Sequence, residues 1–389
     1  MSHDVIVVGA GAAGLMCAIE AGKRGRSVLV LESNDQVGRK ILISGGGRCN
    51  FTNLNADPEC YISANPDFCR SALARYTPYD FIDLVEQHGI AYHEKKLGQL
   101  FCDASARRIV DLLVTECRAA GVEVRTGCRV GEVRDVPGGF ALETSLGRFE
   151  TAALVVASGG LSIPKIGATD FGYRLARQFG IDIVAPRPGL VPLTFAGDDL
   201  ALFASLSGVS IDAVVHCGVQ AFRENVLFTH RGLSGPAVLQ ASSYWLEGEA
   251  ITIDLLPSLS AGEWLESLQD DPRDLATVLS QHLPRRFAQA WCHRYAPQLP
   301  LNRYSTRQRE ETAARLQAWE LRPTGTEGFA KAEVTVGGID TRELSSRTLE
   351  SRRVPGLFFV GEVTDVTGWL GGYNFQWAWA SGHAAGQTV

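Results

Sequence analysis

The chain has 389 residues, 45% of them hydrophobic and 21% charged, so it is long enough for two or three domains. Its formal net charge of -6 excludes bulk electrostatic attraction to nucleic acid or an anionic membrane. The nine cysteines are an odd number without a C-x-x-C pair, which is typical of a reduced, cytoplasmic protein. No apolar run has the length of a membrane span. We therefore expect no membrane and no nucleic-acid partner.

The N-terminus has the pattern of a β-α-β unit. Asp4–Val8 is a short apolar strand, a helix is expected from Ala12 to about Lys23, and Ser27–Leu31 is a second buried strand. Between the first strand and the helix, Gly9–Gly14 has the G-x-G-x-x-G spacing of dinucleotide-binding proteins.

Each position of this motif has its own physical reason. Gly9 permits the tight turn, Gly11 lets the backbone approach a pyrophosphate, and Gly14 lets the helix pack closely on the strands. The helix N-terminus then faces the phosphates, and Glu32 accepts hydrogen bonds from ribose hydroxyls. The expected cofactor contacts of this segment are Gly9, Gly11, Ala12, Ala13, Gly14 and Glu32.

The C-terminus indicates which dinucleotide is bound. Gly356–Glu362 is a buried strand ending in a glycine and an acid, and Gly368–Asn374 is a glycine-rich turn before an expected helix from about Phe375 to Ala385. The strand-end acid can hold the ribityl or pyrophosphate part of FAD, and the helix N-terminus can stabilise charge on the reduced flavin. The alternative is a strand-turn-helix that only completes the sheet. The expected FAD contacts here are Gly361, Glu362, Asp365, Gly372, Tyr373 and Asn374.

The segment Gly38–Asn50 contains three consecutive glycines among polar residues. Such a donor-rich loop suits an anion or a close backbone approach, whereas the alternative is a solvent-exposed hinge. Cys49 beside Arg48 could have a lowered pKa, although a buried, inert thiol is favoured. The expected cofactor contacts are Arg39, Lys40, Ser44, Gly45, Gly46, Gly47, Arg48, Cys49 and Asn50, with Val130 and Ala157 at the ends of two later strands.

The remaining pattern indicates an insertion. Residues 66–121 are mainly helical by pattern, with breaks near Gly89 and Gly98. A small strand meander is expected next, and a separate apolar strand after it: the strands are Val122–Val130, Glu132–Val136, Phe140–Thr144 and Arg148–Thr151, then Ala153–Ala157. After residue 188 short antiparallel strands are followed by helical stretches at 261–295 and 306–321, and Ala332–Val336 returns to strand. We predict a nucleotide-binding domain in two pieces, 1–187 and 332–389, interrupted by a substrate or cap domain at 188–331.

Four stretches resemble the BaiN/YhiN-like family of bacterial NAD(P)/FAD-dependent oxidoreductases, which are aminoacetone oxidase-like flavoproteins. These stretches are Gly38–Asn53, Ser158–Asp170, Phe228–Pro236 and Gly361–Asn374. The resemblance implies an α/β fold in which a Rossmann-type FAD-binding domain is interrupted by a β-barrel-like part and a small helical part. Members of the family act on diverse substrates, so the resemblance does not give the substrate.

The catalytic residue is not identified by the sequence, and no metal-ligand spacing is present. His230 is a candidate acid or base because its ordinary pKa lies near 6.5, but it is more simply a turn histidine that bonds the local backbone. Arg48 and Tyr373 are further candidates.

We therefore expect an FAD-dependent oxidoreductase that transfers a hydride between flavin N5 and a small organic substrate. The expected redox partner is NAD(P)H or oxygen. NAD(P)H is expected only as a transient donor, because the sequence has no second G-x-G-x-x-G. One alternative is a flavoprotein that modifies a macromolecule such as tRNA, against which the acidic charge and the lack of an aromatic-basic stripe count. Another is a non-catalytic FAD-binding redox module. The oligomeric state is not indicated.

Overall fold

The computed structural model describes residues 2–389, and their contacts divide the chain into two units. The first unit is made of the residues up to Arg187 together with Val334–Val389, and the second is Pro188–Glu333. The first unit is thus assembled from two sequence pieces. No helix among residues 2–389 is long and apolar enough to cross a membrane.

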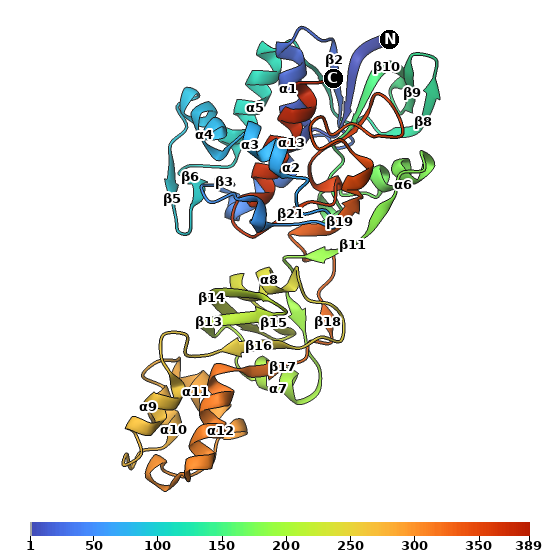
Figure 1. The fold of residues 1–389 in the computed structure, drawn as a ribbon. Helices are drawn as coiled ribbons and strands as arrows, with labels where there is room; N and C mark the ends of the chain where they lie inside the picture. Colours follow the sequence, from blue (N-terminus) through green and yellow to red (C-terminus); the bar gives the residue numbers. More distant parts are fainter. Residues whose placement is uncertain (1) are drawn as a thin grey trace. The chain divides into compact units, whose positions relative to one another are not determined.

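A mostly parallel sheet forms the centre of the first unit (Figure 1). Its parallel strands are β7 (Glu123–Arg125), β2 (Val28–Leu31), β1 (Ser2–Val8), β10 (Gly147–Val156) and β20 (Leu357–Phe359). Two strands pair with the edge of β10 that faces away from β1. Strand β9 (Gly139–Thr144) pairs antiparallel with the first half of β10, and β20 pairs parallel with its last three residues. The meander is completed by β8 (Val130–Val136). The parallel strands β1, β2 and β10 therefore end on the same side, which is where ligands bind in such sheets.

Helix α1 (Ala12–Lys23) packs closely against the last helix, α13 (Tyr373–Gly386). The contact requires small residues, because a Cβ added at Gly382 would lie 2.4 Å from the carbonyl oxygen of Ala13. A Cβ added at Gly386 would lie 2.7 Å from the carbonyl oxygen of Cys17. The two ends of the chain are therefore tied together beside the central sheet.

The region 66–121 is less helical than its pattern predicts. It contains α3 (Arg70–Arg75), α4 (Pro78–Gln87) and α5 (Arg107–Ala119), but a hairpin of β5 (Tyr92–Glu94) and β6 (Gln99–Cys102) lies between α4 and α5. The hairpin forms because β6 pairs with β3 (Asn50–Asn53), a long-range partner that a local pattern does not show. The other elements of this unit are α2 (Arg39–Ile43), β4 (Tyr61–Ile62), α6 (Phe171–Gln178), β11 (Ile183–Gly189), β19 (Val334–Ile339) and β21 (Thr367–Gly368).

The second unit contains an antiparallel seven-stranded sheet in the order β17-β16-β13-β14-β15-β12-β18. Its strands are β12 (Leu193–Thr194), β13 (Ser210–Cys217), β14 (Gln220–Thr229), β15 (Gly232–Ser234), β16 (Ile251–Asp254), β17 (Trp319–Leu321) and β18 (Gly325–Thr326). Two helices, α7 (Gly197–Ser205) and α8 (Pro236–Ser242), accompany the sheet. Phe203 of α7, Phe228, Trp319 and Phe287 of α11 (Arg285–Tyr295) form a buried aromatic core between the sheet and these two helices.

A group of four helices lies at one end of this sheet (Figure 1). They are α9 (Ala261–Ser267), α10 (Leu275–Leu279), α11 (Arg285–Tyr295) and α12 (Thr306–Gln317). The expected helical stretch 261–295 is thus broken twice. Asp274 caps α10 by accepting a hydrogen bond from the Thr277 N–H at 2.7 Å, and Pro284 immediately precedes α11. The expected helix 306–321 ends at Gln317, because residues 319–321 pair as β17 with β16.

His383 on α13 makes the stability of the first unit depend on pH. Its ring lies 4.8 Å from the ring of Tyr76, and its Nε2 is 3.7 Å from Glu20 Oε2. Burial lowers the pKa of His383, an effect that the charge of Glu20 opposes. The folded protein therefore binds fewer protons than the unfolded protein below about pH 6.5, so the free energy of unfolding falls as the pH drops through that value.

We expect His383→Gln to reduce this loss of stability between about pH 7.5 and about pH 5.5. Denaturant unfolding at both pH values measures the effect, with His216→Gln, at an exposed position of β13, as the control. An unchanged difference between the two pH values would show that His383 does not cause it.

Candidate cofactor and catalytic site

The glycine motif between β1 and α1 has the geometry of a phosphate-binding turn. Gly9 has φ +111°, and a Cβ there would lie 2.4 Å from the Ala157 carbonyl oxygen. A Cβ at Gly14 would lie 2.0 Å from the Gly9 carbonyl oxygen. A Cβ at Gly11, by contrast, would meet no atom within 4 Å. Two glycines are thus required by packing, whereas Gly11 faces open space.

The N-terminus of α1 offers free donors to this open space. Gly11 is the N-cap and provides no side-chain hydrogen bond, and Ala12 and Ala13 form the first turn without polar side chains. The first N–H groups of a helix need partners from outside it, and phosphate is a common one. The space and the donors together fit the pyrophosphate of a dinucleotide.

Glu32 is fixed beside the glycine turn at the end of β2. Its Oε2 accepts a hydrogen bond from the Ala10 N–H at 2.9 Å, and its Oε1 accepts from the Asn34 N–H at 2.8 Å. Arg39 donates to the side-chain oxygen of Asn34 at 2.6 Å, so it supports Glu32 through Asn34. A carboxylate oxygen can accept more than one hydrogen bond, so Oε2 can still accept from a ribose hydroxyl.

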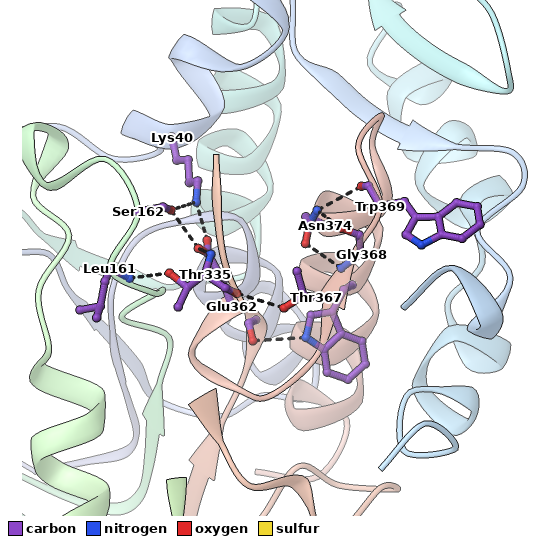
Figure 2. Close-up of polar contacts among 11 residues, drawn as sticks. Lys40, Leu161, Ser162, Thr335, Glu362, Thr367, Gly368, Trp369 and Asn374 are labelled. Atoms are coloured by element: carbon purple, nitrogen blue, oxygen red, sulfur yellow. Dashed lines mark hydrogen bonds and ion pairs between the residues drawn. The ribbon is translucent and has the colours of Figure 1, made fainter. Parts of the chain in front are cut away.

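Glu362 lies in a polar cluster that joins four separate segments of the chain (Figure 2). Lys40 Nζ lies 2.5 Å from Glu362 Oε2 and donates to Ser162 Oγ at 2.7 Å. Glu362 Oε1 accepts from Ser162 Oγ at 3.0 Å and from the Thr335 N–H at 2.9 Å. Thr335 Oγ1 in turn accepts from the Leu161 N–H at 2.8 Å. The side chains of Lys40 and Glu362 therefore bind each other and fix the surrounding loops.

Strand β3 holds the glycine-rich turn before α13. Asn53 Nδ2 donates to the Gly371 carbonyl oxygen at 2.8 Å. With the Asn50 amide in the orientation that gives both of its ends partners, its oxygen accepts from the Gly372 N–H at 3.3 Å. Gly372 has φ +99°, and a Cβ there would lie 2.3 Å from the Thr52 carbonyl oxygen. Asn374 closes the turn by bonding both the N–H and the carbonyl oxygen of Gly368 (Figure 2). The N-terminus of α13 is thereby held in one position.

Two ionisable candidates in this region are buried. Asp365 accepts from the Ala64 N–H at 2.8 Å, and burial raises the pKa of its carboxyl group. Burial also raises the pKa of Tyr373, whose ring lies edge-on to that of Tyr61. The Tyr373 phenol therefore stays protonated at neutral pH and is excluded as a general base, though not as a proton donor.

The Gly38–Asn50 loop folds back on itself beside β6. Ser44 Oγ donates to the Ile41 carbonyl oxygen at 2.7 Å, and Gly45, Gly46 and Gly47 all have positive φ. Cys49 is fully buried, and burial raises its pKa, so the lowered pKa suggested by Arg48 is wrong. Arg48 itself is exposed. The loop thus presents backbone groups and one guanidinium, not a reactive thiol.

The remaining candidates are placed less specifically. Val130 begins β8 and pairs with Thr144, whereas Ala157 follows β10 and its N–H donates to the Val8 carbonyl oxygen. His230 belongs to the second unit, where it is exposed on the turn between β14 and β15.

Sequence reasoning did not select Ser162, Thr335, Asn53 and Gln376 as site residues. Gln376 is fully buried in α13, where its side-chain oxygen accepts from Thr52 Oγ1 at 2.7 Å and its Nε2 donates to the Tyr76 carbonyl oxygen. A glutamine among the aromatic residues of this helix was the available signal, because a buried amide requires partners.

Comparison with known proteins identifies the family. The family described as "HI0933-like protein Rossmann domain" matches residues 3–388. The chain is 50% identical over 390 residues to "Ribosomal RNA dihydrouridine synthase" of Escherichia coli (strain K12), covering 99% of this chain and 98% of that protein. It is 47% identical to the Haemophilus influenzae (strain ATCC 51907 / DSM 11121 / KW20 / Rd) protein of the same name, with the same coverage.

A more distant relative has another name. The chain is 30% identical over 404 residues to "3-dehydro-bile acid delta(4,6)-reductase" of Clostridium scindens (strain ATCC 35704 / DSM 5676 / VPI 13733 / 19), covering 98% of both proteins. Among solved structures, a 3-ketosteroid-delta4-(5alpha)-dehydrogenase from Rhodococcus jostii RHA1 matches 99% of this chain and 97% of that chain, at 16% identity and a TM-score of 0.49. That likeness is too distant to bear on function.

The fold and the family together define an enzyme, an FAD-dependent oxidoreductase with an α/β, Rossmann-type FAD-binding domain, as the sequence predicts. The chain belongs to the HI0933-like Rossmann family. The expectation of no nucleic-acid partner is wrong, because the two relatives at 50% and 47% identity are named for a ribosomal RNA substrate. Net charge is an average over the chain and does not report a local RNA-binding surface.

Proposed function

We propose that the protein reduces uridine in ribosomal RNA to dihydrouridine, with bound FAD as its cofactor. The observation that carries this proposal is 50% identity over 99% of the chain to an enzyme named for that reaction. Of the functions expected from the sequence, the macromolecule-modifying flavoprotein is favoured over an enzyme of small organic substrates. The proposed substrate is ribosomal RNA, whereas the example that the sequence suggested was tRNA.

The proposed reaction is the saturation of a conjugated double bond. When bound and reduced, FAD supplies the hydride that adds to C6 of uracil, while a proton adds to C5 and the C5=C6 bond becomes single. The same chemistry applies to a delta(4,6)-unsaturated 3-oxo compound, the kind of substrate for which the 30% identical relative is named. NAD(P)H is the proposed source of the electrons. It would dock transiently, because the sequence has no second dinucleotide motif.

Residues of the first unit are proposed to hold FAD in three places. The α1 N-terminus at Gly11 would bind the pyrophosphate, and Glu32 would accept from the adenosine ribose. The α13 N-terminus, held by Asn53 and Asn374, would lie at the N1 edge of the flavin and favour its reduced form. The Lys40–Glu362 pair would keep the loops around the cofactor closed.

An anaerobic mixing experiment tests the substrate class. Reduced holoenzyme is mixed with an unmodified ribosomal RNA transcript, with a DNA of the same sequence, and with a 3-oxo-delta4 steroid, and re-oxidation of the flavin is followed. We expect the RNA alone to re-oxidise the flavin rapidly, because only the RNA contains uracil. Re-oxidation by the steroid and not by the RNA would favour a small-molecule reductase and overturn the proposal.

A further inference from the structure

The second unit carries its charges in two distinct parts of its sequence. Residues 188–284 contain three arginines and twelve acidic residues. Residues 285–315 contain seven arginines and only two acidic residues, Glu310 and Glu311. The net charge of the chain conceals this basic segment, which comprises α11, the turn after it and most of α12.

The basic side chains of α11 lie on its solvent face. Phe287, Ala288, Trp291 and Cys292 are buried and form the inner face of the helix. Arg285, Gln289 and His293 are exposed and follow at intervals of four residues, so they share the opposite face. A membrane-surface helix would expose its large apolar residues, whereas α11 buries them, so this face does not suit a lipid surface.

Four of the seven guanidinium groups have no acidic partner within 4 Å in the part of the chain that the structure describes. Arg294, Arg307 and Arg309 pair with Asp199, Glu311 and Glu266, respectively. Arg286 donates to the carbonyl oxygens of Ser205 and Ser207, and Arg315 donates to that of Tyr295, so their charges are not neutralised. Arg285 and Arg303 are exposed and make no ion pair among these residues.

An aromatic ring lies among these charges. The guanidinium groups of Arg294 and Arg315 lie 5.3 Å and 5.6 Å from the centre of the Tyr295 ring. Phosphate contacts by arginine together with nearby aromatic rings are typical of surfaces that bind single-stranded RNA. Arginine is also the residue best suited to bidentate phosphate binding.

We propose that Arg285, Arg286, Arg303 and Arg315, the four arginines of the helical part without an acidic partner among residues 2–389, together form a surface that binds the phosphates of the RNA substrate; we call this proposed surface the arginine face. This inference rests on the proposed function, since it assigns a docking surface for the same RNA. The face would hold a large, structured RNA by its backbone, and base chemistry would take place at the FAD-binding unit. No particular RNA sequence is required, because phosphate contacts do not read bases.

Binding at different salt concentrations tests the face. Arg285→Gln with Arg303→Gln is compared with wild-type holoenzyme for binding to an unmodified ribosomal RNA transcript. We expect roughly tenfold weaker binding, and a slope of log K against log salt that is smaller by about 1.4 to 1.8, because two phosphate contacts are lost. The matched control is Arg134→Gln with Arg148→Gln, two exposed arginines of the first unit that pair with Glu132 and Glu150.

The outcomes separate this inference from the proposed function. If wild-type protein forms dihydrouridine but the Arg285/Arg303 variant binds RNA with the wild-type affinity and slope, the arginine face is overturned alone. If the variant loses RNA binding but wild-type protein forms no dihydrouridine, the proposed function is overturned alone. If the Arg285/Arg303 variant loses binding to anionic vesicles but keeps the wild-type binding to RNA, the arginine face is also overturned. Thermal melting and the rate of flavin reduction by NAD(P)H should be unchanged in the variant.

Discussion

Gly11→Ala is expected to leave the protein folded but to weaken FAD binding at least about tenfold, which is about 1.4 kcal/mol. A Cβ at Gly11 meets no atom within 4 Å, so the apoprotein has room for it. The same Cβ would occupy the space proposed for the pyrophosphate. Titration of apoprotein with FAD, followed by flavin fluorescence, measures the loss.

Gly14→Ala is the matched variant and should behave in the opposite way. A Cβ at Gly14 would lie 2.0 Å from the Gly9 carbonyl oxygen and 3.0 Å from Ala157 Cβ, so the backbone would have to move. Overpacking of this kind costs about 3 kcal/mol, and we expect a large loss of stability even without FAD. Full FAD affinity in Gly11→Ala would contradict the proposed pyrophosphate site, whatever the result for Gly14→Ala.

The second large effect concerns the Lys40–Glu362 pair. Lys40→Met is expected to lower the free energy of unfolding by about 2 kcal/mol, because it leaves the partly buried carboxylate of Glu362 without its counter-charge. Glu362→Gln added to Lys40→Met should recover part of the loss, since the amide oxygen still accepts from the Thr335 N–H. Urea unfolding of the two single variants and the double variant gives the coupling free energy. Additive effects would show that the pair does not act as a unit.

The sequence predicted what local spacing determines. The turn at Gly9, Gly11 and Gly14 depends on a strand and a helix that are adjacent in the chain, and helix α1 spans Ala12–Lys23 as expected. The element types of the C-terminal piece were also predictable, because strand β20 and helix α13 each have a clear apolar pattern. Strand β10 was expected as two segments, but Gly147–Val156 is continuous.

The partners of the polar residues could not be predicted in this way. Glu362 was predicted as a cofactor contact from its place at a strand end, but its partner Lys40, which is 322 positions away in the sequence, was not predicted. Such a pairing is created by the fold and leaves no local pattern. The hairpin of β5 and β6 was missed for the same reason, because it depends on pairing with β3.

The basic segment in the second unit was a different kind of omission. Seven arginines between Arg285 and Arg315 were visible in the sequence together with Tyr295 and Tyr304. They were judged by the net charge of the whole chain, in which the acidic residues of 188–284 outweigh them. Charge counted in windows shorter than the expected helices would have shown the segment, because the expected helix 261–295 as a whole contains four arginines and five acidic residues.

The most direct test of the proposed function is nucleoside mass spectrometry of ribosomal RNA. Unmodified transcripts are incubated with purified holoenzyme and NAD(P)H, digested to nucleosides and compared with reactions that contain Gly11→Ala protein. We predict a nucleoside two hydrogens heavier than uridine in the wild-type reaction and much less of it with the variant. If NAD(P)H reduces the flavin of the wild-type enzyme but no dihydrouridine forms in any of the transcripts, the proposed function is contradicted.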